Sequence, residues 1–66
     1  MLRRLHRHLI IKDDVTEPDL VKKIKASGLT LMDEICLFTG SSESNLLNEL
    51  EQLQESYQFD FHTFYL

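Results

Sequence analysis

The sequence predicts an α+β fold, with three helices between two short strands contributed by the N- and C-termini. Pro18, Gly28 and Gly40 divide the chain into segments of helical length. Leucines recur at helical spacing after Gly40, whereas the last ten residues alternate as a strand does. Because the chain has 66 residues and neither linker nor repeat, we expect one domain over residues 1–66.

The first segment, residues 2–12, fits two structures. Its leucines have helical spacing, but Leu5, Arg7, Leu9 and Ile11 also recur at every second position, as residues on one face of a strand do. The β-branched side chains of Ile10 and Ile11 favour a strand over residues 7–12.

The first helix is predicted to begin at a capping box formed by Thr16 and Asp19, with Pro18 in its first turn. Gly28 is predicted to end it. The apolar stripe of this helix consists of Leu20, Val21 and Ile24.

Two further helices follow. Thr30 and Asp33 repeat the capping pattern before a helix over residues 32–39 that Gly40 ends. Serines are predicted to cap a third helix over residues 43–56. The caps are Ser41 and Ser42, and the apolar stripe is Leu46, Leu50, Leu53 and Tyr57, widened by Leu47.

The tail, residues 57–66, is predicted to be a strand with one aromatic face that closes the core. That face consists of Tyr57, Phe59, Phe61, Thr63 and Tyr65. The opposite face ends in Phe64 and Leu66, which a chain of this size need not cover. The strand could pair with residues 7–12, with its own copy in a homodimer, or with a strand of a partner protein.

The spacing around Gly40 resembles the helix-turn-helix core of bacterial winged-helix domains. The small residue Cys36 precedes Gly40 by four positions, and leucines follow it at six, ten and thirteen. The resemblance covers residues 17 to about 61. It implies a helix-turn-helix fold with the third helix as recognition helix. Two departures are Ser41, where the family has an apolar residue, and the single strand after the third helix, which truncates the wing.

Charge is segregated along the chain. Residues 1–28 contain all seven basic residues and four acids, whereas residues 29–66 contain seven acids and no Lys or Arg. Such segregation indicates that the two halves attract each other or that two molecules meet head to tail.

The outward face of the third helix is predicted to bind protein. It consists of Ser44, Asn48, Glu51 and Glu55. Duplex DNA binding draws most of its affinity from Lys and Arg, which this helix lacks, so nucleic acid is the less favoured partner. The basic arm, Arg3, Arg4 and Arg7, could still enter a minor groove, or it could pair with acids of the third helix in its own or a neighbouring chain.

Nothing in the sequence has the pattern of a catalytic, cofactor or metal site, so we predict a protein that is not an enzyme. His6, His8 and His62 lack the spacing of zinc ligands, and Cys36 is expected to be buried and inert. We also expect no secretory signal, no membrane span and a cytoplasmic location.

Taken together, these features predict a non-catalytic protein–protein interaction module, a small regulator or adaptor that docks on a larger protein. Its predicted partner-binding residues are those of the third-helix face together with Phe64 and Leu66. The alternative is a DNA-binding transcriptional regulator that uses the basic arm and the helix-turn-helix.

Overall fold

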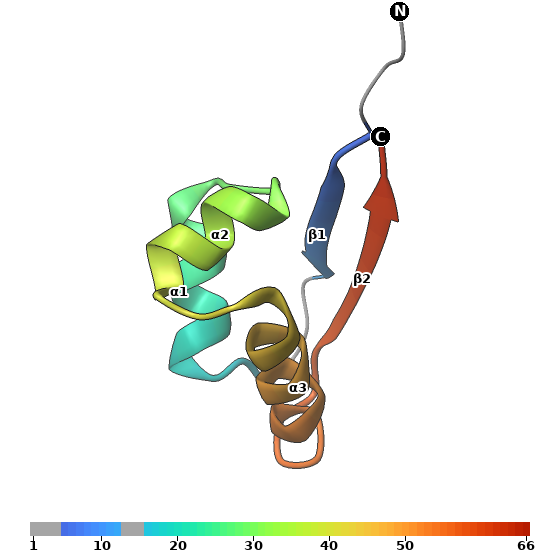
Figure 1. Ribbon diagram of the computed structural model, residues 1–66. Helices are drawn as coiled ribbons and strands as arrows, with labels where there is room; N and C mark the ends of the chain where they lie inside the picture. The colour runs from blue at the N-terminus through green and yellow to red at the C-terminus, as the bar shows by residue number, and fades with distance from the viewer. Residues whose placement is uncertain (1–4, 13–15) are drawn as a thin grey trace, which may run out of the picture.

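The computed structural model describes residues 5–12 and 16–66, which form three helices and a two-stranded antiparallel sheet (Figure 1). The elements follow in the order β1 (Arg7–Lys12), α1 (Asp19–Ser27), α2 (Met32–Thr39), α3 (Glu43–Leu53) and β2 (Asp60–Tyr65). All three helices lie on the same side of the sheet (Figure 1). The predicted α+β class is therefore confirmed.

The first segment is a strand, as the β-branched residues indicate, and it pairs with the tail of the same chain. The register runs from Arg7 opposite Tyr65 to Lys12 opposite Asp60. Of the three pairings that the tail allowed, the intramolecular one is thus present. It brings the positively charged half of the chain against the negatively charged half.

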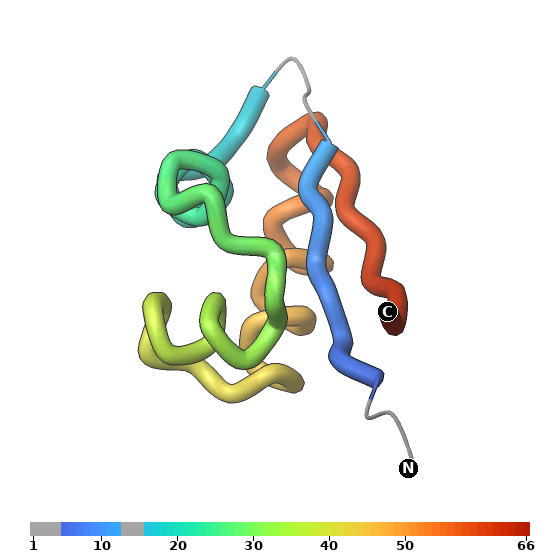
Figure 2. Tube along the Cα trace, turned by 90° about the horizontal axis from the view of Figure 1, so that it is seen from above, coloured from blue at the N-terminus to red at the C-terminus, as the bar shows by residue number. Residues whose placement is uncertain are grey.

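The strand β1 lies between two neighbours. On one side it pairs with β2, and on the other His8 forms an isolated antiparallel bridge with Leu31. There the Leu9 N–H donates a hydrogen bond of 2.8 Å to the Thr30 carbonyl. In Figure 2, β1 and β2 run side by side along one flank of the molecule, with β2 outermost.

The core collects buried apolar side chains from β1, from all three helices and from the residue before β2. The side chains buried there are Leu9, Val21, Ile24, Met32, Ile35, Leu46, Leu50 and Phe59. Those of α1 and α3 belong to the predicted helical stripes, since i and i+3 or i+4 side chains share one face.

The two threonine caps predicted for the first helices are wrong. Pro18 and Leu31 occupy the N-cap positions, and neither helix has a side-chain cap. The Thr16 hydroxyl instead accepts a 2.6 Å hydrogen bond from the Gln58 N–H, which ties the start of α1 to the approach to β2. The Thr30 hydroxyl lies 3.4 Å from the Nδ1 atom of His8 in β1. The threonine hydroxyls that were predicted to cap the helices therefore contact residues distant in the sequence instead.

The third helix begins as predicted but ends earlier. Ser42 is its N-cap, and its hydroxyl accepts a hydrogen bond of 3.3 Å from the Asn45 N–H. The helix stops at Leu53, and residues 54–56 form a turn. The Gln54 side chain donates to the Phe59 carbonyl at 3.1 Å, which stabilises the reversal of the chain into β2.

The aromatic face of the tail closes the core over only part of its length. Phe59 is buried and Phe61 packs against the core, but Tyr57 is 39% exposed and Tyr65 is 63% exposed. Tyr57 precedes the strand. At Tyr65 the guanidinium of Arg7 lies 5.9 Å from the ring centre, so a cation rather than an apolar helix side chain contacts this end of the face.

Replacing a core leucine is expected to unfold most of the protein. Leu50 is fully buried, and Leu50→Ala should cost about 2–5 kcal/mol. A domain of this size has about 3–5 kcal/mol of stability from its core. Urea denaturation followed by circular dichroism measures the change. Leu37→Ala is the control, because Leu37 is 86% exposed and its loss should change the free energy of unfolding by less than about 0.5 kcal/mol. Equal losses for the two variants would contradict the assigned core.

Candidate functional site

The predicted face of α3 is exposed. Its side chains contact no other described residue through a hydrogen bond or ion pair. These side chains are Ser44, Asn48, Glu51 and Glu55, and the adjacent Glu49 and Gln52 are exposed as well. Because no cation lies on this helix, the face presents carboxylates, amides and a hydroxyl to solvent. It fits a basic protein surface better than a phosphate backbone.

Arg7 binds the third helix of its own chain. Its Nη1 donates to Glu43 Oε2 at 2.6 Å, and its Nη2 donates to the Thr63 hydroxyl at 3.0 Å. The Nε atom is buried and has no hydrogen-bond partner within the described residues. One side chain from β1 thus joins α3 and β2. Arg3 and Arg4, the other members of the predicted basic arm, lie outside the described residues.

Two lysines of α1 also contact their own chain. The Lys25 ammonium donates to Glu17 Oε2 at 2.6 Å, and the Lys23 ammonium lies 5.5 Å from the centre of the Phe38 ring. The side chains of Lys12 and Lys22 are exposed.

The free edge of β2 is the most distinctive feature of the sheet. His6 and Leu66 exchange two backbone hydrogen bonds, of 3.1 and 3.0 Å, just beyond the pair formed by Arg7 and Tyr65. In an antiparallel pair, hydrogen-bonded and non-hydrogen-bonded residue pairs alternate. The backbone groups of the even-numbered residues of β2 therefore face β1. Those of Phe61, Thr63 and Tyr65 face away from it.

Nothing in the described part of the chain covers this edge. The backbone groups of Phe61, Thr63 and Tyr65 form no hydrogen bond to a third segment among residues 5–12 and 16–66. The edge also lacks the devices that usually protect a strand from pairing, since residues 61–65 include neither Lys nor Pro. Leu66, at the end of β2, is 74% exposed. The edge can therefore accept another strand.

The outer face of the sheet carries a row of rings. Phe64 stacks on His8 of the opposite strand, with ring centres 5.2 Å apart and planes 13° apart, and lies 6.0 Å from the ring of His62. Phe64, which the sequence left open to exposure, is half-buried. No group of three or more His, Cys, Asp or Glu side chains suited to a metal ion is present among the described residues.

Cys36 is half-buried, whereas the sequence predicted full burial. Desolvation raises the pKa of its thiol, and the negative charges of Glu43 and Asp33 raise it further. A higher pKa leaves less thiolate at neutral pH, which is the form that reacts. This side chain therefore has the properties of a packing residue rather than a nucleophile.

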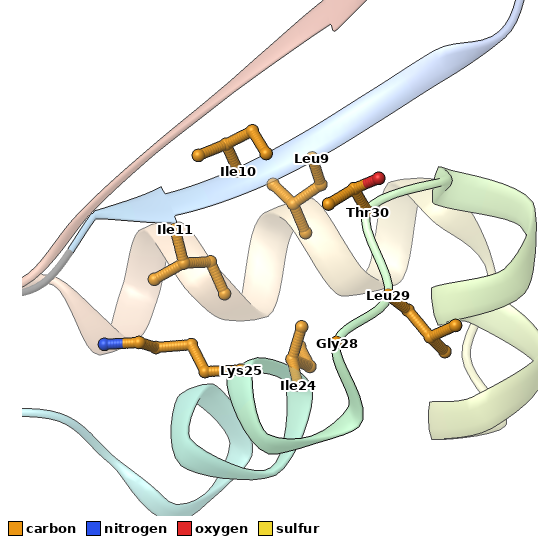
Figure 3. A pocket seen from close by; sticks show the side chains of 8 residues that line it. All are labelled: Leu9, Ile10, Ile11, Ile24, Lys25, Gly28, Leu29 and Thr30. Atoms are coloured by element: carbon orange, nitrogen blue, oxygen red, sulfur yellow. The ribbon is translucent and has the colours of Figure 1, made fainter.

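A cavity of about 210 Å³ lies between β1 and α1 (Figure 3). Its lining comprises Leu9, Ile10, Ile11, Ile24, Lys25, Gly28, Leu29 and Thr30. Ile11 and Ile24 point toward each other across it (Figure 3). The walls are mostly apolar and come from segments far apart in the sequence, so no local pattern could have predicted the cavity. With few polar groups to orient a substrate, it is suited to holding an apolar side chain rather than to catalysis.

No protein-family model, curated protein or solved structure matches the chain. Within the described residues, none of the helices has the length and apolar character needed to cross a membrane.

The contact between Arg7 and Glu43 is expected to stabilise the fold modestly. In a double-mutant cycle of Arg7→Met and Glu43→Gln, the coupling energy should be about 0.5–1 kcal/mol and should fall as salt is added. Urea denaturation of the four proteins measures it. Glu49→Gln makes the same chemical change on an exposed residue of the same helix, and its coupling to Arg7→Met should be close to zero. If Arg7→Met had the same coupling energy with Glu43→Gln as with Glu49→Gln, the contact between Arg7 and Glu43 would not contribute specifically to stability.

Proposed function

We propose that this chain is a non-catalytic protein-interaction module that takes up an extended segment of a partner protein along the free edge of β2. The observation that carries the proposal is the outward direction of the backbone groups of Phe61, Thr63 and Tyr65 on an uncovered strand. In strand addition, main-chain hydrogen bonds supply affinity and the alternating side chains supply specificity. Phe64 and Leu66 lie on the outer face of this edge, where they can contact alternate side chains of the added segment.

The acidic face of α3 is proposed as a second contact, for a basic region of the same partner. It is formed by Ser44, Asn48, Glu51 and Glu55, all exposed. Charge complementarity of this kind speeds association and favours the correct partner more than it increases affinity. A chain that contributes two such surfaces and no catalytic group suits a small regulator or adaptor docked on a larger protein. We propose a cytoplasmic location, which agrees with a single cysteine.

We further propose that α2, Gly40 and α3 form a helix-turn-helix of the winged-helix type that serves as a scaffold. Gly40 adopts a left-handed conformation with φ of 73°, and its N–H donates to the Cys36 carbonyl at 2.8 Å. Leu46 and Leu50 are buried against the rest of the core. These contacts support the helix–glycine–helix arrangement to which the spacing of the leucines points.

The alternative function, a DNA-binding regulator, requires cations that face outward. Arg7 is bound to Glu43 and Thr63 instead. The exposed face of α3 would bring carboxylates toward the phosphates. Both observations favour a protein partner.

Strand addition predicts that extended peptides selected from a display library bind the edge of β2. Thr63→Pro removes the outward N–H, whereas Thr63→Val keeps it, and both variants lose the hydroxyl that Arg7 contacts. Isothermal titration should give similar affinities for the wild type and Thr63→Val. Binding to Thr63→Pro should be about three- to tenfold weaker, as expected for the loss of the one hydrogen bond that the Thr63 N–H would donate. Selected peptides that bind Thr63→Pro as tightly as Thr63→Val would contradict the proposal.

The wild-type protein and both Thr63 variants should bind duplex DNA weakly. Titration with a fluorescent duplex at low salt should show no binding tighter than micromolar, because the described arginine is paired and α3 has no cation. Tight binding that declines steeply with salt, and that is lost when Arg3, Arg4 and Arg7 are changed to Ala together, would favour the DNA-binding alternative instead.

A further inference from the structure

We propose that the strand accepted by β2 is the β2 of a second copy of this chain, antiparallel to the first around a two-fold axis at Thr63. The result is one four-stranded sheet with β1 at both edges and the two β2 strands in the centre. This inference rests on the proposed function, because it uses the same strand edge and names its partner.

The backbone geometry selects this register. With the axis at Thr63, Thr63 faces Thr63 of the second copy, and Phe61 faces Tyr65 in both directions. All of these residues direct their backbone groups to the free edge, so each opposed pair can exchange two hydrogen bonds.

Shifting the axis by one residue loses part of this pairing. An axis at His62 would place Tyr65 opposite Phe59, whose carbonyl already accepts a hydrogen bond from Gln54. An axis at Phe64 would leave Phe61 opposite no residue of the strand. The axis at Thr63 is therefore the one that engages the whole edge.

The side chains of the outer face are complementary to their own copies in this register. His62 of each chain would lie opposite Phe64 of the other. Within the chain, the directly opposed pair of His8 and Phe64 stacks its rings at 5.2 Å. The dimer repeats that ring pairing across the axis, so that each Phe64 lies between the histidines of two neighbouring strands.

The inner face gains contacts at its exposed end. Tyr65, 63% exposed in the single chain, would face Phe61 of the second copy. Opposed aromatic side chains stabilise antiparallel sheets. The pairing therefore covers a large side chain that the core of one chain leaves in water.

Charge also favours a second copy at this edge. The net charge of the chain is −4, and most surfaces of its acidic half would repel their own copies. Residues 61–65 contain no Asp, Glu, Lys or Arg, so two β2 strands can approach without like charges in contact. Asp60 would lie opposite the apolar side chain of Leu66 rather than opposite Asp60 of the second copy.

Sedimentation of the full chain over a range of concentrations tests the dimer. The wild type and Thr63→Val should dimerise with similar dissociation constants, and Thr63→Pro should dimerise at least about tenfold more weakly. Circular dichroism establishes that each variant is folded. A wild type that is monomeric at every accessible concentration, or a Thr63→Pro variant that dimerises as well as Thr63→Val, overturns the inference.

Thiol crosslinking tests the register without relying on proline. In a Cys36→Ser background, Thr63→Cys should be joined to its own copy by a short thiol crosslinker. It should react at least about tenfold faster than His62→Cys or Phe64→Cys, because only residue 63 faces itself, at about 5.5 Å between Cα atoms. Faster crosslinking at position 62 or 64 overturns the axis at Thr63.

The two tests separate this inference from the proposed function. If the wild type is monomeric but still binds selected peptides through a Thr63→Pro-sensitive edge, the strand-accepting module stands and the second copy is excluded as its partner. If the wild type neither dimerises nor binds peptides at this edge, both proposals fail.

Discussion

The pairing of β1 with β2 is the constraint on which the rest of the structure depends. It joins the first and last elements of the described chain, and all three helices lie between these two strands in the sequence. The pairing turns Leu9 inward, where it is buried with the helical side chains. It also determines which backbone groups of β2 remain free, because the residues that bond to β1 cannot bond outward. The register between β1 and β2 therefore determines both the fold and the backbone groups of the candidate binding edge.

Arg7 shows how the segregated charges contribute to this arrangement. A basic N-terminal half and an acidic C-terminal half attract each other over long range, but that attraction alone does not specify a register. The hydrogen bonds from Arg7 to Glu43 and Thr63 help to specify the register, because they join β1, α3 and β2 at one point. By engaging its guanidinium within the chain, the fold also removes the described arginine from the surface on which nucleic acid would depend. Among the described residues, the exposed side chains of Ser44, Asn48, Glu51 and Glu55 form no ion pair with an arginine.

The sequence predicted the elements whose signals are local. Gly28 and Gly40 both adopt the left-handed conformation and end their helices, and Leu46 and Leu50 of the predicted α3 stripe are buried. Features decided by distant contacts were not predictable in this way. The Thr16 hydroxyl bonds to Gln58 rather than capping a helix, and α3 ends early because the chain turns into β2. For the candidate site, alternation predicted a strand with two apolar faces. Which backbone groups of this strand face outward depends on its register with β1. The sequence alone could not give that register, because it left three pairing partners open.

The composition of β2 supports the proposal that its free edge pairs with another strand. An exposed edge invites aggregation, and a single Lys or Pro among residues 61–65 would discourage pairing at small cost, because such residues are accommodated on edge strands. The chain carries three aromatic residues and a threonine there instead. Phe61 packs against the core and Phe64 is half-buried, but Tyr65 is 63% exposed, and its exposed surface adds nothing to the stability of an isolated chain whose core contributes about 3–5 kcal/mol. In the proposed strand addition a second strand would cover this surface, and the pairing would then add to the stability of a molecule with a thin core.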